Sequence, residues 1–507
     1  MTNSQRIIVN TTAQYTRTII NVCLSLYSTR LILTALGQSD FGIYSVVAGV
    51  VTMLSFMTNA LISTTQRYLS FNHGKGDKDK IYQVFGNSVL LHLFIGLGLT
   101  VVLGILAYPV VYSVLHIEPV RQSASMAVYF AAVMILLLMF LTAPFRALFI
   151  ARENIVYISV VDVIDGVLRL LIAVFLTYIV SYDKLILYAL LLTGISLFDL
   201  LAFAVYALRH FEECHLPRMR ELDKSYFSDL SSFAGWTIYS TGCILARTQG
   251  MAIILNRFFG SVMNAAYGIA QQVTGAVHFV AQSVMNAMSP QIMKAEGAGE
   301  RNRMLSLSES SSKYATLLMA LAAIPLIFEM PAVLLFWLKE VPDNAIIFCR
   351  FVLIASVCDQ LTTGLGIANQ AIGQIRDYSL VVNTIKVLTL PAAWLGLHFG
   401  LPVVSAMWWY VGMELVAALV RMVFLKITAG LSITQFIKNV FVRSFFPIAA
   451  MTIACCACVR WIELPYRFLI TIAVSTLVGS VTIWCIGLTD YERETFKNNI
   501  LAKIIKK

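Results

Sequence analysis

Charged residues are scarce in this chain of 507 residues, where Asp, Glu, Lys and Arg together make up only 13% of the sequence. An ordinary soluble domain carries about 25% charged residues. Apolar residues instead reach 59%, and the mean hydropathy is +0.79. This balance excludes a soluble cytosolic enzyme, a disordered protein and a secreted disulfide scaffold. It is typical of a polytopic, all-α membrane protein.

Acidic residues are also fewer than basic ones, 27 against 37, which gives a formal net charge of +10. In a soluble protein such a surplus would suggest nucleic acid as a partner. Here no basic stripe lies outside the connections between apolar segments, so we expect no nucleic-acid partner. The surplus is better explained by cationic loops that fix the orientation of membrane spans.

Patterns for metal binding and for secretion are missing as well. Cys455, Cys456 and Cys458 form a cluster without a His or Cys partner at zinc spacing, and we expect them to be small core residues. The His, Glu and Cys residues of 210–215 also match no standard zinc pattern, so we expect no metal site. Residues 1–10 do not have the pattern of a signal peptide, and we expect the first span to be retained.

Fourteen apolar segments are long enough to cross a membrane, because about 20 residues span the hydrocarbon core. We expect these spans at 11–36, 41–65, 85–113, 123–145, 156–180, 185–208, 229–256, 261–289, 314–338, 344–372, 377–398, 402–426, 441–459 and 468–488. The first, seventh and eighth are polar for helices that face lipid. The remaining length leaves no room for a sizeable soluble domain.

The distribution of basic residues predicts the orientation of these spans. With the N-terminus in the cytoplasm, 25 Lys and Arg residues fall on the inner side, 7 on the outer side and 5 within spans. This bias predicts that both termini are cytoplasmic. The segment 489–507 is basic and carries apolar residues on one helical face, including Phe496 and Ile500. It is either an amphipathic helix on the inner leaflet or a frayed basic tail.

An internal repeat appears when the sequence is shifted by 223 residues. Gly37 then aligns with Gly260, and Tyr44 aligns with Tyr267. The segment of glycines and charged residues at 74–80 aligns with a similar segment at 297–303. Six spans separate the copies, so both copies face the same way, as in transporters built from parallel repeats. The domains expected from the repeat are an N-lobe at 1–210, a linker at 211–228, a C-lobe at 229–426, a helix pair at 427–488 and a tail at 489–507.

The glycine-charge segments are not phosphate-binding loops. Gly74 and Lys75 are followed by Gly76, whereas a P-loop lysine is followed by Ser or Thr. We therefore expect no ATP and no other cofactor. Any transport would use a gradient or the free energy of the cargo itself.

Three motifs carry a resemblance to a known family. The runs Leu36–Tyr44 (LGQSDFGIY), Thr65–Ser70 (TQRYLS) and Gly74–Asp77 (GKGD) resemble the polysaccharide-biosynthesis, Wzx-like flippases. These belong to the multidrug/oligosaccharidyl-lipid/polysaccharide exporter superfamily. The resemblance covers essentially the whole chain, as two six-helix lobes followed by a C-terminal helix pair.

The resemblance implies a function, a location and partners. It implies that an undecaprenyl-diphosphate-linked oligosaccharide is flipped outward across a bacterial inner membrane, by alternating access of a central cavity. The partners would be this lipid-linked oligosaccharide, membrane lipids and a complex that polymerises the glycan. The family has no universal catalytic signature to transfer, so candidate site residues must come from the chain itself.

Basic and polar residues inside the spans are the candidates for binding an anionic cargo. A charge in the bilayer usually faces a cavity or a partner, and arginine suits phosphate. The predicted substrate-binding residues are Arg17, Arg30, Arg247, Arg257, Gln271, Gln272, Lys386 and Trp408. Two alternatives remain open: Arg30 and Arg257 could snorkel to the outer interface, and Trp408 could serve helix packing instead of stacking on a sugar.

Acidic residues inside the spans are candidates for a coupling ion. Asp165 and Arg169 are i,i+4 neighbours, and Asp162 lies one turn back on the same face. This group is either a self-neutralised cluster or a cation or proton site at Asp162 and Asp165. Four further acids are expected to be single and without a partner: Asp199, Glu329, Asp359 and Glu414.

Two other functions compete with the flippase. A drug or metabolite cation antiporter of the same superfamily would need an acid in the cavity. Spans 1, 2, 7 and 8 offer arginines and no buried acid, which favours the flippase. A membrane polymerase or ligase would need sugar-binding outer loops. The outer connections are short and show no nucleophile with a base, so we expect no enzyme.

Overall fold

The computed structural model describes residues 3–52, 54–114, 117–178, 183–214, 224–338, 341–464, 466–490 and 492–494. These residues form helices and short connections and contain no strand. Part of the expected linker, 215–223, and most of the expected tail, 495–507, lie outside the described residues. The prediction of an amphipathic tail helix therefore concerns residues that are not described.

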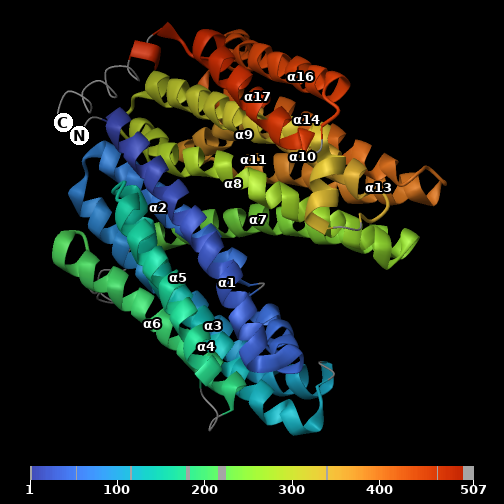
Figure 1. The fold of residues 1–507 in the computed structure, drawn as a ribbon. Coiled ribbons are helices and arrows are strands. Elements are labelled where there is room, and N and C mark those ends of the chain that lie inside the picture. The colour runs from blue at the N-terminus through green and yellow to red at the C-terminus, as the bar shows by residue number, and fades with distance from the viewer. Residues whose placement is uncertain are drawn as a thin grey trace, which may run out of the picture. The chain divides into compact units, whose positions relative to one another are not determined.

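The N-terminal half contains six long helices. Their order along the chain is α1 (Asn3–Thr52), α2 (Ser55–Lys75), α3 (Lys78–Pro109), α4 (Gln122–Ala151), α5 (Ile155–Tyr178) and α6 (Lys184–His210), as coloured from blue to green in Figure 1. A π-helical turn, η1 (Val110–Val114), extends α3, and a 3-10 turn, η2 (Pro119–Arg121), precedes α4.

The C-terminal half is longer and less regular. It contains α7 (Lys224–Phe259), α8 (Ser261–Gly297), α9 (Arg301–Leu338), α10 (Ala345–Ile372), α11 (Ile375–Tyr378), η4 (Ser379–Asn383), α12 (Thr384–Val387), α13 (Thr389–His398), α14 (Val404–Ala429), α15 (Ile433–Phe436), η5 (Ile437–Val442), α16 (Arg443–Trp461), α17 (Arg467–Thr482) and η6 (Ile483–Gly487). The predicted eleventh span is therefore broken into three short α-helices around a π-helix, η4.

Each of the fourteen predicted spans falls on helical backbone, apart from span ends and short breaks such as those at Leu54 and Leu388. Among the described residues, nine helices are long and apolar enough to cross a membrane by composition alone. Several of the other helices carry charges in their interior. For example, α5 contains two aspartates and an arginine, and α14 contains Glu414 and Arg421. Hydropathy alone misses such helices because charged residues count against a membrane span, although these charges have ion-pair partners.

The chain forms two compact units. The N-unit comprises residues 9–241, and the C-unit comprises residues 1–8 and 242–507. The change of unit lies between Thr241 and Gly242, inside α7. The finer domain limits expected from the repeat stay a prediction.

Backbone conformation supports the repeat. Gly37 (φ 78°, ψ 168°) interrupts α1, and its counterpart Gly260 (φ 80°, ψ −168°) separates α7 from α8. Gly76 and Gly299, which are also 223 residues apart, have φ values of 72° and 77°. A side chain is strained at positive φ, so the same four positions require glycine for the same reason. The two halves thus share the turns between their first helices.

Small residues allow close packing in the C-unit. The amide of Gly364 on α10 donates a hydrogen bond to Ser312 Oγ on α9 over 3.0 Å. A Cβ at Gly364 would collide with the carbonyl of Ser308 and with the hydroxyls of Ser311 and Ser312. Small and hydroxyl-bearing residues are common at helix interfaces in membranes, where lipid offers no hydrophobic driving force between helices.

Candidate functional site: a buried charge network

Arg247 on α7 is a buried cation with a defined counter-ion. Its Nη1 donates to Glu414 Oε1 on α14 over 2.5 Å, and the two side chains are only 7% and 3% exposed. The guanidinium also lies over the ring of Tyr410, with 4.4 Å between Cζ and the ring centroid. The ring face stabilises the cation electrostatically while leaving its outer edge available.

Lys386 on α12 lies between two carboxylates. Its Nζ is 2.8 Å from Asp359 Oδ1 on α10 and 3.0 Å from Glu414 Oε2 on α14. The lysine side chain is 5% exposed. Its helix has four residues and is bounded by η4 and by the turn at Leu388. A π-helical interruption of this kind often occurs at functional sites.

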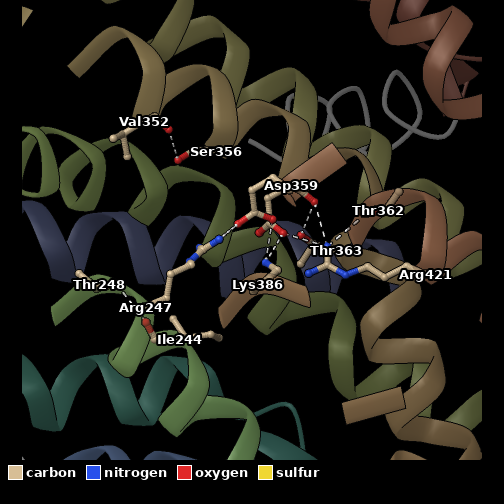
Figure 2. Close-up of polar contacts among 11 residues, drawn as sticks. Ile244, Arg247, Thr248, Val352, Ser356, Asp359, Thr362, Thr363, Lys386 and Arg421 are labelled. Carbon is tan, nitrogen blue, oxygen red and sulfur yellow. Dashed lines mark hydrogen bonds and ion pairs between the residues drawn. The ribbon is translucent and has the colours of Figure 1, made fainter. Parts of the chain in front are cut away.

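Arg421 on α14 completes the network. Its Nη1 is 2.9 Å from Asp359 Oδ1 and donates to Thr362 Oγ1 over 3.2 Å. Arg421 is one of the 25 basic residues that the charge distribution places on the inner side, but it lies inside α14, which continues to Ala429, and it is buried. Figure 2 shows the side chains of Lys386 and Arg421 pointing toward Asp359.

The expectation of unpartnered acids is also wrong for three of the four residues. Asp359 pairs with Lys386 and Arg421, and Glu414 pairs with Arg247 and Lys386. Glu329 on α9 pairs with Arg467 over 2.8 Å, outside this network. A buried charge without a partner is costly, and each of these three acids has a base from another helix as its partner. The sequence shows bases in spans 7, 11 and 12, but it does not show which acid each of them contacts.

The network carries a surplus of positive charge. Three bases (Arg247, Lys386 and Arg421) face two acids (Asp359 and Glu414), which leaves a formal charge of +1 when all are ionised. Nε of both arginines is buried and makes no hydrogen bond within the described part of the chain. The network therefore has unused donors and one uncompensated cation, the features expected of a site for an oxygen-rich anion.

The N-unit contains a second ionic cluster. Asp162 on α5 contacts Arg17 on α1 over 2.5 Å and Arg146 on α4 over 2.7 Å. Asp165 contacts Arg169 over 2.8 Å, so the i,i+4 pair is present. Both coupling-ion candidates, Asp162 and Asp165, are therefore held by arginine. Arg17 faces a carboxylate within its own unit.

The two clusters are related by the repeat with inverted charge. Asp162 and Lys386 lie 224 residues apart, one more than the repeat, on corresponding spans. In the N-unit an acid is held by two bases, and in the C-unit a base is held by two acids. Each cluster thus has one charged side chain between two of opposite sign, and the central charge is negative at Asp162 and positive at Lys386.

The other predicted binding residues lie outside the network. Arg30, Arg257 and Gln272 are exposed, and Gln271 is half-buried. Trp408 is 64% exposed, and its ring packs edge-on against Phe351 with 4.8 Å between centroids. A role for these five residues in binding stays a prediction.

The connection after α6 forms a structural tether. Glu213 is buried, lies 2.5 Å from Arg152 and is 3.5 Å from His73 Nε2. Burial alone would raise the pKa of Glu213, but its contacts with His73 and Arg152 outweigh burial and lower the pKa to about 2. Burial, together with the charge of Glu213, raises the pKa of Cys214 to about 12. Within the described residues, no three His, Cys, Asp or Glu side chains are grouped as metal ligands.

Comparison with known proteins identifies a family. A family model described as "Polysaccharide biosynthesis protein" matches residues 4–296, which is more than half of the chain. None of the curated proteins is similar enough to count as a match.

Several solved structures share the fold. A MATE protein crystallised in the bent conformation is 13% identical, with a TM-score of 0.73 over 85% of this chain and 96% of that chain. The MATE transporter ClbM in complex with Rb⁺ is 14% identical, with a TM-score of 0.71 over 86% and 96%. A MOP superfamily transporter from Pyrococcus furiosus, described as having a binding pocket of reverse polarity, is 13% identical, with a TM-score of 0.70 over 85% and 96%. The chain therefore has the helical fold of these transporters and is a multi-pass membrane protein.

Proposed function

The chain belongs to the polysaccharide biosynthesis protein family, and from this premise we propose that it flips an undecaprenyl-diphosphate-linked oligosaccharide from the cytoplasmic to the periplasmic leaflet. The membrane is the bacterial inner membrane, and the carrier exposes its binding site to the two sides in turn. A complex that polymerises the glycan is the proposed recipient of the cargo. The fold shared with MATE and MOP superfamily proteins is compatible with this role.

The buried charge network of the C-unit is the observation that carries the proposal. A lipid diphosphate presents acceptor oxygens and about two negative charges. The surplus cation and the Nε groups of Arg247 and Arg421, which make no hydrogen bond with the described residues, match those oxygens. Arginine forms bidentate bonds to phosphate, and the low dielectric of the interior strengthens them. Arg247, Lys386 and Arg421 are the proposed contacts of the diphosphate.

The same network argues against a carrier for organic cations. Both of its carboxylates already have two basic partners. A cationic drug would therefore meet a site with surplus positive charge instead of a free acid. The Pyrococcus furiosus relative, described as having a pocket of reverse polarity and a different function, supports the idea that pocket charge separates functions on this fold.

Asp162 and Asp165 stay the proposed residues for a coupling ion. Asp162 contacts Arg17 and Arg146, and Asp165 contacts Arg169. A coupling ion that binds here would displace these arginines from the carboxylates.

Reconstitution tests the proposed function directly. The purified protein is placed in liposomes that contain an undecaprenyl-diphosphate-linked oligosaccharide, and a lectin or glycosidase reports the glycan on the outer leaflet. The wild type should speed its appearance, and Arg421→Gln, which removes the surplus charge, should slow it at least tenfold. Arg460→Gln, at an exposed arginine of α16, is the matched control. Equal rates for liposomes with and without wild-type protein would refute the function.

Topology reporters test the proposed orientation. With both termini in the cytoplasm, periplasmic reporters fused in the connections 37–40 and 181–184 should be active. A reporter at Lys78 or Arg301 should be silent, because these residues lie in the inner connections that carry most of the basic charge. Activity at Lys78 would reverse the orientation.

A further inference from the structure

We propose that Asp359 and Glu414 form a site for one monovalent cation, and that the ammonium of Lys386 is its built-in occupant. The ammonium contacts both carboxylates, at 2.8 Å and 3.0 Å. An ammonium head group is a compact point charge of about the size of a potassium ion. The site thus has the charge and the size to bind a small cation, and the ammonium of Lys386 occupies it. This inference concerns the cation and does not depend on the cargo.

The carboxylates are held in place by groups other than Lys386. Arg247 binds Glu414 through Oε1, whereas Lys386 contacts Oε2. Arg421 binds Asp359 and is itself tied to Thr362. Removing the lysine amine would therefore leave Glu414 paired with Arg247 and Asp359 paired with Arg421. Glu414 Oε2 would lose its only basic contact, since it makes no hydrogen bond with the described residues.

The backbone holds the ammonium at the site. The helix of Lys386 directly follows a π-helix, and the amides of Thr384 and Leu388 donate to the carbonyls of Leu380 and Thr384, so the helix continues through it. A π-helical interruption of this kind often occurs at functional sites. The ammonium is therefore tethered to a hydrogen-bonded helix. A tethered cation also frees the site from any need for sodium or potassium.

At the corresponding place in the N-unit, Asp162 is surrounded by Arg17 and Arg146, so a cation would meet two like charges. The proposal therefore predicts that an added cation binds at Asp359 and Glu414 and not at Asp162.

The test removes the occupant and offers a replacement. Wild type, Lys386→Ala and Lys386→Met are purified at full length in detergent. Thermal unfolding is followed in N-methyl-D-glucamine chloride and, at equal ionic strength, in methylammonium, potassium or rubidium chloride. The wild type should be indifferent to the cation. Both variants should have a lower Tm than the wild type in N-methyl-D-glucamine chloride. Their Tm should rise by about 2–4 °C when a small cation replaces N-methyl-D-glucamine. They should also bind one ⁸⁶Rb⁺ per chain, whereas the wild type should bind none.

Two double variants locate the effect. Adding Glu414→Gln to Lys386→Ala should abolish both the Rb⁺ binding and the thermal gain. Adding Glu463→Gln, at an exposed acid of the C-unit, to Lys386→Ala should leave both unchanged. The proposal is overturned if the single variants fold but bind no Rb⁺ and ignore every small cation. It is equally overturned if neither single variant folds in any of these salts, or if the wild type binds Rb⁺ as well as Lys386→Ala does. No cargo is present, so these outcomes are independent of the flippase proposal.

Discussion

Arg247 and Glu414, which are 167 residues apart in the sequence, form a buried ion pair between α7 and α14. Each is also the anchor of another contact: Arg247 lies over Tyr410, and Glu414 contacts Lys386. The pair is therefore the link between α7 and the rest of the charge network. Substituting only Arg247 or only Glu414 by a neutral residue leaves the charge of the other buried without this partner.

A double-mutant cycle should measure this dependence. Arg247→Gln and Glu414→Gln should each lower the free energy of unfolding by about 3–5 kcal/mol, because each leaves a buried charge without its partner. The double variant should lose much less than the sum of the two, and it retains the net charge of +1. Unfolding in detergent, followed by tryptophan fluorescence, gives all three values. Additive losses would show that the two side chains do not interact.

A pair of glycines tests the packing of α9 against α10. Gly364→Ala should destabilise the protein by about 1–3 kcal/mol, because the new methyl group meets Ser308, Ser311 and Ser312. The matched control is Gly412→Ala on α14, where a Cβ would meet nothing within 4 Å. That control should be neutral or slightly stabilising, as expected for alanine in a helix. Equal thermal stabilities of the two variants would argue against the close contact.

The helices were predictable, and the ionic partners mostly were not. Apolar runs predicted the fourteen spans because length and composition act locally. The Asp165–Arg169 pair was also predictable, since both residues lie one turn apart on one helix. Pairs such as Arg247–Glu414 and Lys386–Asp359 join residues of different helices, and one sequence gives no information on which helices meet. For the same reason the count of inner-side charges included Arg421, although it is buried inside α14.

Irregular backbone was the other feature that local patterns missed. Gly37 and Gly260 marked two turns, because glycine is the residue that tolerates positive φ. The π-helix at 379–383 carries neither glycine nor proline, so no breaker signal was available there. The position of Lys386 between two acids could therefore be found only in the folded chain.

The tether at Glu213 predicts a pH dependence of stability. Its pKa is lowered from 4.5 to about 2 in the folded protein, which corresponds to about 3 kcal/mol. Because the folded pKa is below the unfolded one, this stability is present above about pH 4.5 and is lost as the pH falls toward 2. Glu213→Gln should remove it at neutral pH, and the difference between wild type and variant should vanish in acid. A constant difference from pH 7 to pH 3 would contradict the assignment.

The membrane potential should drive the proposed transport. A cargo with about two negative charges moves outward from a negative interior, and each charge crossing the field gains about 2.3 kcal/mol per 100 mV. The empty charge network has a surplus of +1, so the same field draws the unloaded carrier back. Collapsing the potential in the liposomes should therefore slow flipping while the pH gradient is held constant. In Arg421→Gln the network is neutral, so the potential should no longer speed the return of the empty carrier. Collapsing the potential should therefore slow flipping less in this variant than in the wild type. If flipping instead followed the pH gradient and ignored the potential, the cargo charge would not be the driving term, and Asp162→Asn and Asp165→Asn would be the variants that stop transport.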